Sequence, residues 1–70
     1  MKPQDIQAGH RFKLPGNDTV YEALSEPRPY VHGPEGDVVI EVRWNGETGM
    51  KEDEIAFSGR TDVRRVVAPI

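Results

Sequence analysis

Apolar and polar residues alternate along most of this chain with a period of two, which is the spacing of a β-strand and not of a helix. Only residues 4–8 permit a helical turn, because Pro3 and Gly9 confine them. The alternation predicts five short strands, over residues 10–14, 19–25, 38–43, 50–57 and 63–68. Within the fourth of these, the charged residues 51–54 are typical of an edge or bulged segment. The sequence therefore predicts an all-β protein.

A single long loop interrupts the strands. Residues 27–37 contain three prolines and two glycines and separate the second predicted strand from the third. Five short strands with one long loop indicate a small, partly open barrel of the SH3-like kind, with an OB-like barrel or a small split β-sandwich as the alternatives. The 70 residues suffice for one domain, spanning 1–70.

The Asn-Gly pair at 45–46 predicts a hairpin. A two-residue turn there would leave the apolar face of residues 38–43 without apolar neighbours. A three-residue turn over 44–46, with Gly46 in the left-handed position, pairs Arg43 with Glu47, Val42 with Thr48 and Ile40 with Met50. We therefore expect the three-residue turn, and we expect Trp44 at the shoulder of the hairpin. The predicted core consists of Phe12, Ile40, Val42, Met50 and Phe57.

The run Arg-Trp-Asn-Gly-Glu at 43–47 is followed by Phe57, Gly59, Asp62 and Val63, and the first predicted strand opens with Gly-His-Arg at 9–11. In these residues, over about half of its length, the chain resembles small SH3-like β-barrel domains of unknown function found in actinobacteria and their phages. The long loop and the acidic segment 51–54 depart from that pattern. The resemblance supports a barrel and implies no activity.

The net charge of −3, from nine basic and twelve acidic residues, lacks the positive field that broad nucleic-acid binding requires. No uninterrupted apolar run exceeds three residues, far below the roughly 20 needed to cross a bilayer, and no signal-peptide pattern opens the chain. We expect a cytoplasmic protein without membrane contact. Cysteine is absent, which excludes disulfides and thiolate metal sites.

Residues for catalysis are sparse. The two histidines, His10 and His32, have no spacing that would complete a metal site with the acids at 52–54. Ser25 and Ser58 lie in turn contexts, outside any nucleophile motif. We expect no enzymatic activity, no metal and no cofactor.

Binding to another protein is the leading hypothesis, as a small adaptor module encoded in a phage or an operon. The loop 27–37 carries Arg28, Tyr30 and His32 at alternate positions, and proline stiffening reduces the ordering cost of binding. With Trp44 these residues form the predicted partner surface, since Tyr, Trp and Arg concentrate binding energy. Two structural alternatives stay open: Tyr30 and Val31 fold back over the barrel end, or Trp44 is a buried plug.

Two further functions remain as alternatives. Arg60, Arg64 and Arg65 form the one basic patch of the sequence, which with an aromatic platform would bind nucleic acid. Strand alternation turns Arg64 and Arg65 to opposite faces, which weakens that idea. A self-associating structural subunit is the other alternative, because an edge strand over 63–68 invites pairing with its own copy in a homodimer.

Overall fold

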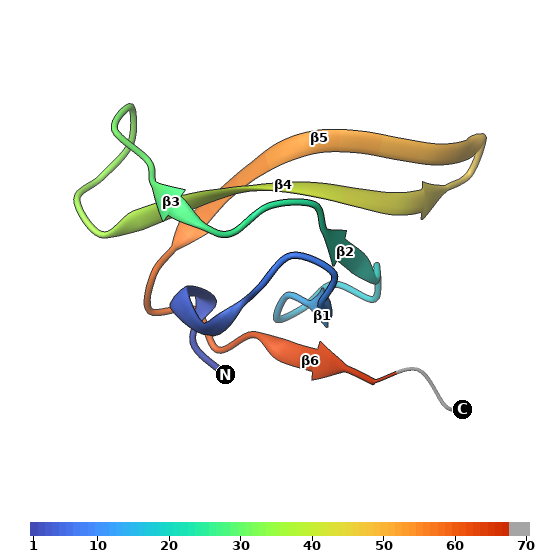
Figure 1. The fold of residues 1–70 in the computed structure, drawn as a ribbon, viewed down its shortest axis with the longest axis horizontal. Helices are drawn as coiled ribbons and strands as arrows, with labels where there is room; N and C mark the ends of the chain where they lie inside the picture. The colour runs from blue at the N-terminus through green and yellow to red at the C-terminus, as the bar shows by residue number, and fades with distance from the viewer. Residues whose placement is uncertain (68–70) are drawn as a thin grey trace.

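A computed structural model describes residues 1–67, and in it the alternating segments form one antiparallel sheet that curls around a small core (Figure 1). The elements are the 3-10 helix η1 (Pro3–Asp5) and the strands β1 (Arg11–Lys13), β2 (Tyr21–Ala23), β3 (Arg28–Pro29), β4 (Asp37–Gly46), β5 (Gly49–Ser58) and β6 (Arg64–Val66). Over the described residues β5 pairs only with β4 and β6 only with β1, so the sheet does not close. The protein is a small all-β open barrel.

Strand β4 organises the sheet because it is paired along both of its edges. Strand β5 follows its whole length on one side, whereas β2 and β3 lie one after the other on the opposite side. Ala23 of β2 opposes Val42, and Arg28 of β3 opposes Val39. Position 28 is five residues after position 23, whereas the two partners on β4 are only three residues apart. The connection between β2 and β3 therefore bulges out of the ladder.

The predicted strands are confirmed in position, but β1 and β2 are shorter than predicted and β4 and β5 are longer. The loop 27–37 is wrong at its start, because β3 pairs with β4 there and raises the strand number from five to six. The segment 51–54 is an edge, as expected, but the ladder runs through it without a bulge. Strand β6 is shorter than predicted, and Ala68 lies outside the described residues. Within residues 1–67 no helix is long and apolar enough to cross a membrane.

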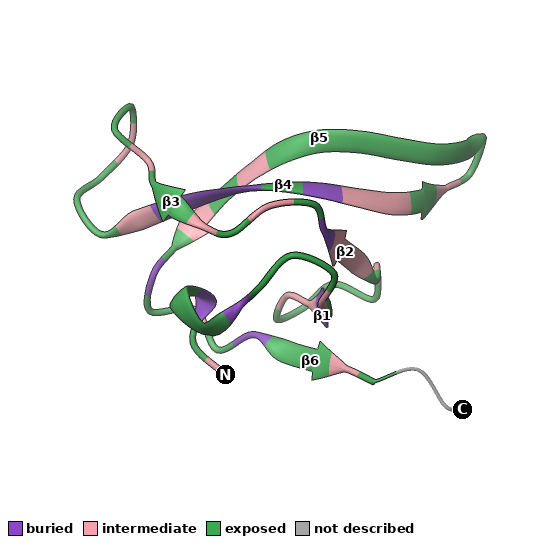
Figure 2. Ribbon diagram, viewed as in Figure 1, coloured by how far each residue is buried: buried purple, intermediate pink, exposed green. Residues whose placement is uncertain are grey.

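The core lies on the concave face of the sheet, where Figure 2 shows the buried positions. Three of the predicted core residues, Phe12, Ile40 and Val42, are fully buried, and Phe57 packs against them. Met50 is wrong: its side chain is 61% exposed. Sequence patterns missed Ile6 and Val63, which complete the core from short irregular segments. Isolated apolar residues of this kind carry no periodic signal.

The hairpin turn differs from the expected one. Glu47 and Thr48 form a two-residue turn, closed by the pair Gly46–Gly49, and Gly49 rather than Gly46 takes the positive φ (119°). Apolar pairing at the far end explains this register, because it sets Val38 opposite Phe57 and Ile40 opposite Ile55.

The observed register differs from the predicted one by an odd number of residues, and such a shift turns every side chain of β5 to the other face. Met50 therefore lies on the convex face of the sheet. Its predicted neighbour, Ile40, instead packs beside Ile55 in the core.

An aromatic row crosses the concave face. Phe12, Tyr21 and Trp44 are directly opposed on β1, β2 and β4. The rings of Phe12 and Tyr21 lie 5.7 Å apart, and those of Tyr21 and Trp44 meet edge to face at 5.5 Å. Only Phe12 is fully buried, whereas Tyr21 and Trp44 are partly exposed. Trp44 therefore lies at the rim of the core, which agrees with the expected partly wet indole although the predicted turn was wrong.

Replacing Ile40 with Ala should lower the free energy of unfolding by about 2 to 5 kcal/mol, because it leaves a cavity in the core. Met50→Ala is the matched control, and an exposed truncation should change stability by no more than about 0.5 kcal/mol. Urea unfolding of both variants measures the difference. Equal losses would mean that Met50 faces the core and that the β4–β5 register is wrong.

Candidate functional site: an acidic groove between the helical turn and the long loop

Three segments that are distant in sequence meet at Gly59, which follows β5. The Gly59 N–H donates to the Gly36 carbonyl at 2.9 Å, and the Gln4 side-chain amide donates to the Gly59 carbonyl at 3.1 Å. A Cβ on Gly59 would lie 2.5 Å from the Gly36 oxygen. Only glycine permits this close approach, which holds η1 beside the loop that precedes β4.

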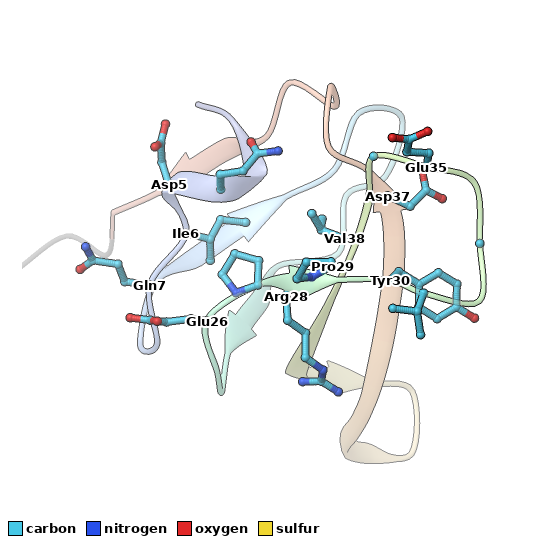
Figure 3. Close-up of a pocket in the computed structure, with 15 residues that line it drawn as sticks. Asp5, Ile6, Gln7, Glu26, Arg28, Pro29, Tyr30, Glu35, Asp37 and Val38 are labelled. Atoms are coloured by element: carbon cyan, nitrogen blue, oxygen red, sulfur yellow. The ribbon is translucent and has the colours of Figure 1, made fainter.

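A groove of about 1090 Å³ opens between these joined segments (Figure 3). Its floor is apolar: Ile6, Pro29 and Val38 lie between its two ends. Other ring or apolar side chains in the lining are Pro27, Tyr30 and Val31. A concave surface of this size, with an apolar floor and polar groups around it, is a usual form of a binding site.

Carboxylates flank this floor at both ends. Figure 3 shows Glu35 and Asp37 at one end and Asp5 and Glu26 at the other. Arg28 is the one cation in the lining, so acids outnumber bases four to one. The groove therefore presents a negative field to any molecule that approaches it.

Arg28 does not neutralise the groove. Its guanidinium points away from the four carboxylates (Figure 3) and pairs with Glu54 of β5 at 3.2 Å. Both side chains are about half exposed, so the pair contributes about 1 kcal/mol or less to stability. By pairing with Glu54, Arg28 leaves the acidic side chains of the groove without a counter-charge from the lining.

Tyr30 is held in place by the backbone around it. Its N–H donates to the Asp37 carbonyl at 3.0 Å, and its ring lies so close over Gly33 that a Cβ there would sit 2.6 Å from the ring. His32 packs edge to face against the ring, with centroids 5.9 Å apart. Tyr30 is partly buried, whereas Val31 is 83% exposed, so Val31 does not cap the barrel end.

The predicted partner surface is therefore wrong in one member. Arg28 and Tyr30 both line the groove, and His32 packs against the Tyr30 ring without lining it, but Trp44 lies apart from them. Tyr30 bonds to Asp37 at the start of β4, and Trp44 follows seven residues later on that strand, roughly 23 Å away at 3.3 Å per residue. The predicted strand over 38–43 already implies a separation of this kind, because an extended strand lies between the loop 27–37 and Trp44.

The basic residues gather in a second hollow, of about 750 Å³. Arg64 and Arg65 line it with Lys13, whereas Arg60 lies outside it. Arg64 opposes Lys13 and Arg65 opposes Phe12, which confirms that the two arginines use different faces of β6. No aromatic side chain of the described residues lines this hollow, so the stacking platform of the nucleic-acid hypothesis is not assembled here.

The hydroxyl and imidazole groups have structural partners. Ser25 Oγ accepts from the Glu41 N–H and Ser58 Oγ accepts from the Arg60 N–H, so both hydroxyls stabilise backbone. His10 Nδ1 accepts from the Gln7 N–H at 3.1 Å. Over residues 1–67 no three histidine, aspartate or glutamate side chains converge as a metal-ligand set.

Comparison with protein-family models, with curated proteins and with solved structures gave no match. The resemblance to SH3-like domains therefore stays a prediction from the sequence.

Two glycine substitutions should distinguish the contacts that join the segments around the groove from those that position its lining. Gly59→Ala should lower the free energy of unfolding by about 1 to 3 kcal/mol, because backbone atoms of Gly36 would have to move. Gly33→Ala meets only the Tyr30 ring and should cost less while shifting that ring. Urea unfolding and the NMR signals of the Tyr30 ring measure the two effects. A stable Gly59→Ala variant would show that the three segments are not tightly joined.

Proposed function

We propose that this protein is a non-catalytic protein-binding module whose acidic groove takes an extended, basic segment of a partner. The observation that carries the proposal is the arrangement of four carboxylates around an apolar floor in one groove. Lysine or arginine side chains of the partner would meet the carboxylates at the two ends. Apolar or proline side chains between them would pack on Pro29, Val38 and the Tyr30 ring.

The rigidity of the lining supports binding without much loss of entropy. Proline fixes the backbone φ angle at two lining positions, Pro27 and Pro29. Strand β3 also pairs with Val38 and Val39 of β4. Gly33 and Asp37 hold Tyr30 in its position. A preformed site of this kind binds with a smaller ordering cost than a flexible loop.

Electrostatics favour this proposal over nucleic-acid binding. Phosphate backbones are repelled by the acidic groove, and the basic hollow at Lys13, Arg64 and Arg65 lacks a stacking surface. Ser25, Ser58 and His10 each accept a hydrogen bond from a backbone N–H, which supports a non-catalytic function.

A peptide of alternating arginine and proline tests the groove, because it stays extended and its prolines cannot donate ladder hydrogen bonds. We expect saturable binding that weakens as salt is added. Tyr30→Ala should reduce affinity about fivefold or more, as for loss of a central aromatic contact. Isothermal titration calorimetry measures the affinity, and Trp44 emission should stay constant, because Trp44 lies far from the groove.

Glu35→Gln and Glu47→Gln form a matched pair, since both acids are exposed but only Glu35 lines the groove. Glu35→Gln should weaken the peptide, and Glu47→Gln should leave its affinity unchanged. Equal losses would indicate attraction to net charge alone. Tight binding of single-stranded oligonucleotides with a steep salt dependence would contradict the proposal and favour the nucleic-acid alternative.

A further inference from the structure

The open edges of the sheet differ in how much backbone they offer. Over residues 1–67, β3, β5 and β6 each have a strand on one side only, but β3 is two residues long and its Pro29 has no N–H, which leaves the edges of β5 and β6. Unpaired N–H and C=O groups on such an edge are a template for another strand. The two edges can therefore be compared as docking sites.

Strand β6 offers little of its edge. Met1 bonds to Val63 in both directions, with its ammonium donating to the Val63 carbonyl at 2.7 Å and its carbonyl accepting from the Val63 N–H at 2.9 Å. This pairing covers the start of the β6 edge. Strand β6 itself is only three residues long, so its free edge is short.

Strand β5 offers a long edge with a regular pattern. The two-residue turn makes Gly46–Gly49 a hydrogen-bonded pair, and bonded pairs then alternate along the hairpin. The odd-numbered residues of β5 therefore bond to β4. The residues whose N–H and C=O groups point to the open edge are Met50, Glu52, Glu54 and Ala56, followed by Ser58, whose carbonyl already accepts from the Thr61 N–H.

Two hydrogen bonds support this assignment. The Leu24 N–H donates to the Glu41 carbonyl at 2.7 Å, which shows that odd-numbered residues of β4 bond away from β5. The Glu54 N–H donates to the Asp53 carboxylate at 2.7 Å, as expected for an N–H that points away from β4. Asp53 is exposed, so an incoming strand can displace this local contact.

The charges on the convex face specify what such a strand would carry. Arg11, Glu22, Arg43 and Glu52 are directly opposed in turn across β1, β2, β4 and β5. Their charges alternate in sign, and Arg43 bonds to Glu22 at 2.8 Å. Glu52 ends this row at the open edge, so a basic residue on an added strand would continue the alternation.

A second β5 strand is a poor occupant in the registers centred on the middle of β5. Antiparallel pairing centred at Glu52 or Asp53 would set Glu52 opposite Glu52 or Glu54 of the other copy, and like charges that oppose each other directly destabilise a sheet.

We propose that the open edge of β5 binds, by strand addition, an extended segment of a partner protein that has a lysine or arginine opposite Glu52.

A peptide of alternating lysine and valine tests strand addition directly, with hydrogen exchange followed by NMR. The amides of Met50, Glu52, Glu54 and Ala56 should gain protection on binding, whereas Lys51, Asp53 and Ile55 are already bonded to β4 and should change little. This period of two distinguishes strand addition from a loose electrostatic association. Uniform protection, or none, would overturn the proposal. Protection of the same amides in concentrated protein without peptide would assign the edge to a second copy and would overturn it too.

Charge reversal tests the role of Glu52. Glu52→Lys should weaken the lysine–valine peptide about tenfold, roughly 1.4 kcal/mol, and should improve a matched glutamate–valine peptide. Glu47→Lys makes the same change in net charge in the turn, away from the ladder, and should have little effect. Equal effects of the two variants would contradict a specific contact at Glu52.

No residue of β5 lines the acidic groove, so variants can test the two sites separately, although Arg28 of the lining pairs with Glu54 of β5. The arginine–proline peptide lacks half of the backbone N–H donors for a ladder, and Glu52→Lys should not change its binding. Tyr30→Ala should leave binding of the lysine–valine peptide unchanged, because Tyr30 does not contact β5 through its hydrogen bonds. If Tyr30→Ala abolished both, a single shared site would replace the separate edge site.

Discussion

Apolar pairing between β4 and β5 is the constraint on which the rest of the structure depends. Val38 opposes Phe57, and Ile40 opposes Ile55, all on the concave face. This register decides which residues of β5 face the core, where the turn falls and how far the hairpin extends past the barrel. The long axis of the molecule, 36 Å, follows that hairpin (Figure 1).

The same register separates the surfaces that could meet a partner. It places Trp44 at one end of β4 and the groove at the other, where Asp37 receives the Tyr30 N–H. It also turns Glu52 to the convex face and its backbone to the open edge. One packing decision in the core therefore determines which polar residues act together on the outside.

In a domain this small, the strands that form the core also form the surface. With 70 residues, almost every strand has one face in the core and the other in solvent. Glycine at position 59 lets η1, the long loop and the end of β5 meet without a side chain between them. The groove is thus a direct product of the way the core is closed.

Periodicity in the sequence was enough to predict the all-β class, the positions of the main strands, and Phe12, Ile40 and Val42 as core. Tyr30 and His32, which the sequence already places two residues apart, lie ring against ring. Local signals of this kind depend on alternation and turn chemistry, which a sequence displays directly.

Only the tertiary structure decided the hairpin register, the burial of Ile6 and Val63, and the gathering of Asp5, Glu26, Glu35 and Asp37 in one groove. Asn45 and Gly46 favour a local turn, but the pairing of Ile55 and Phe57 with β4 buries more apolar surface and prevails. Contacts between distant segments depend on which pairing buries the most side chains at once. That comparison involves the whole chain, so no short stretch of sequence reveals its outcome.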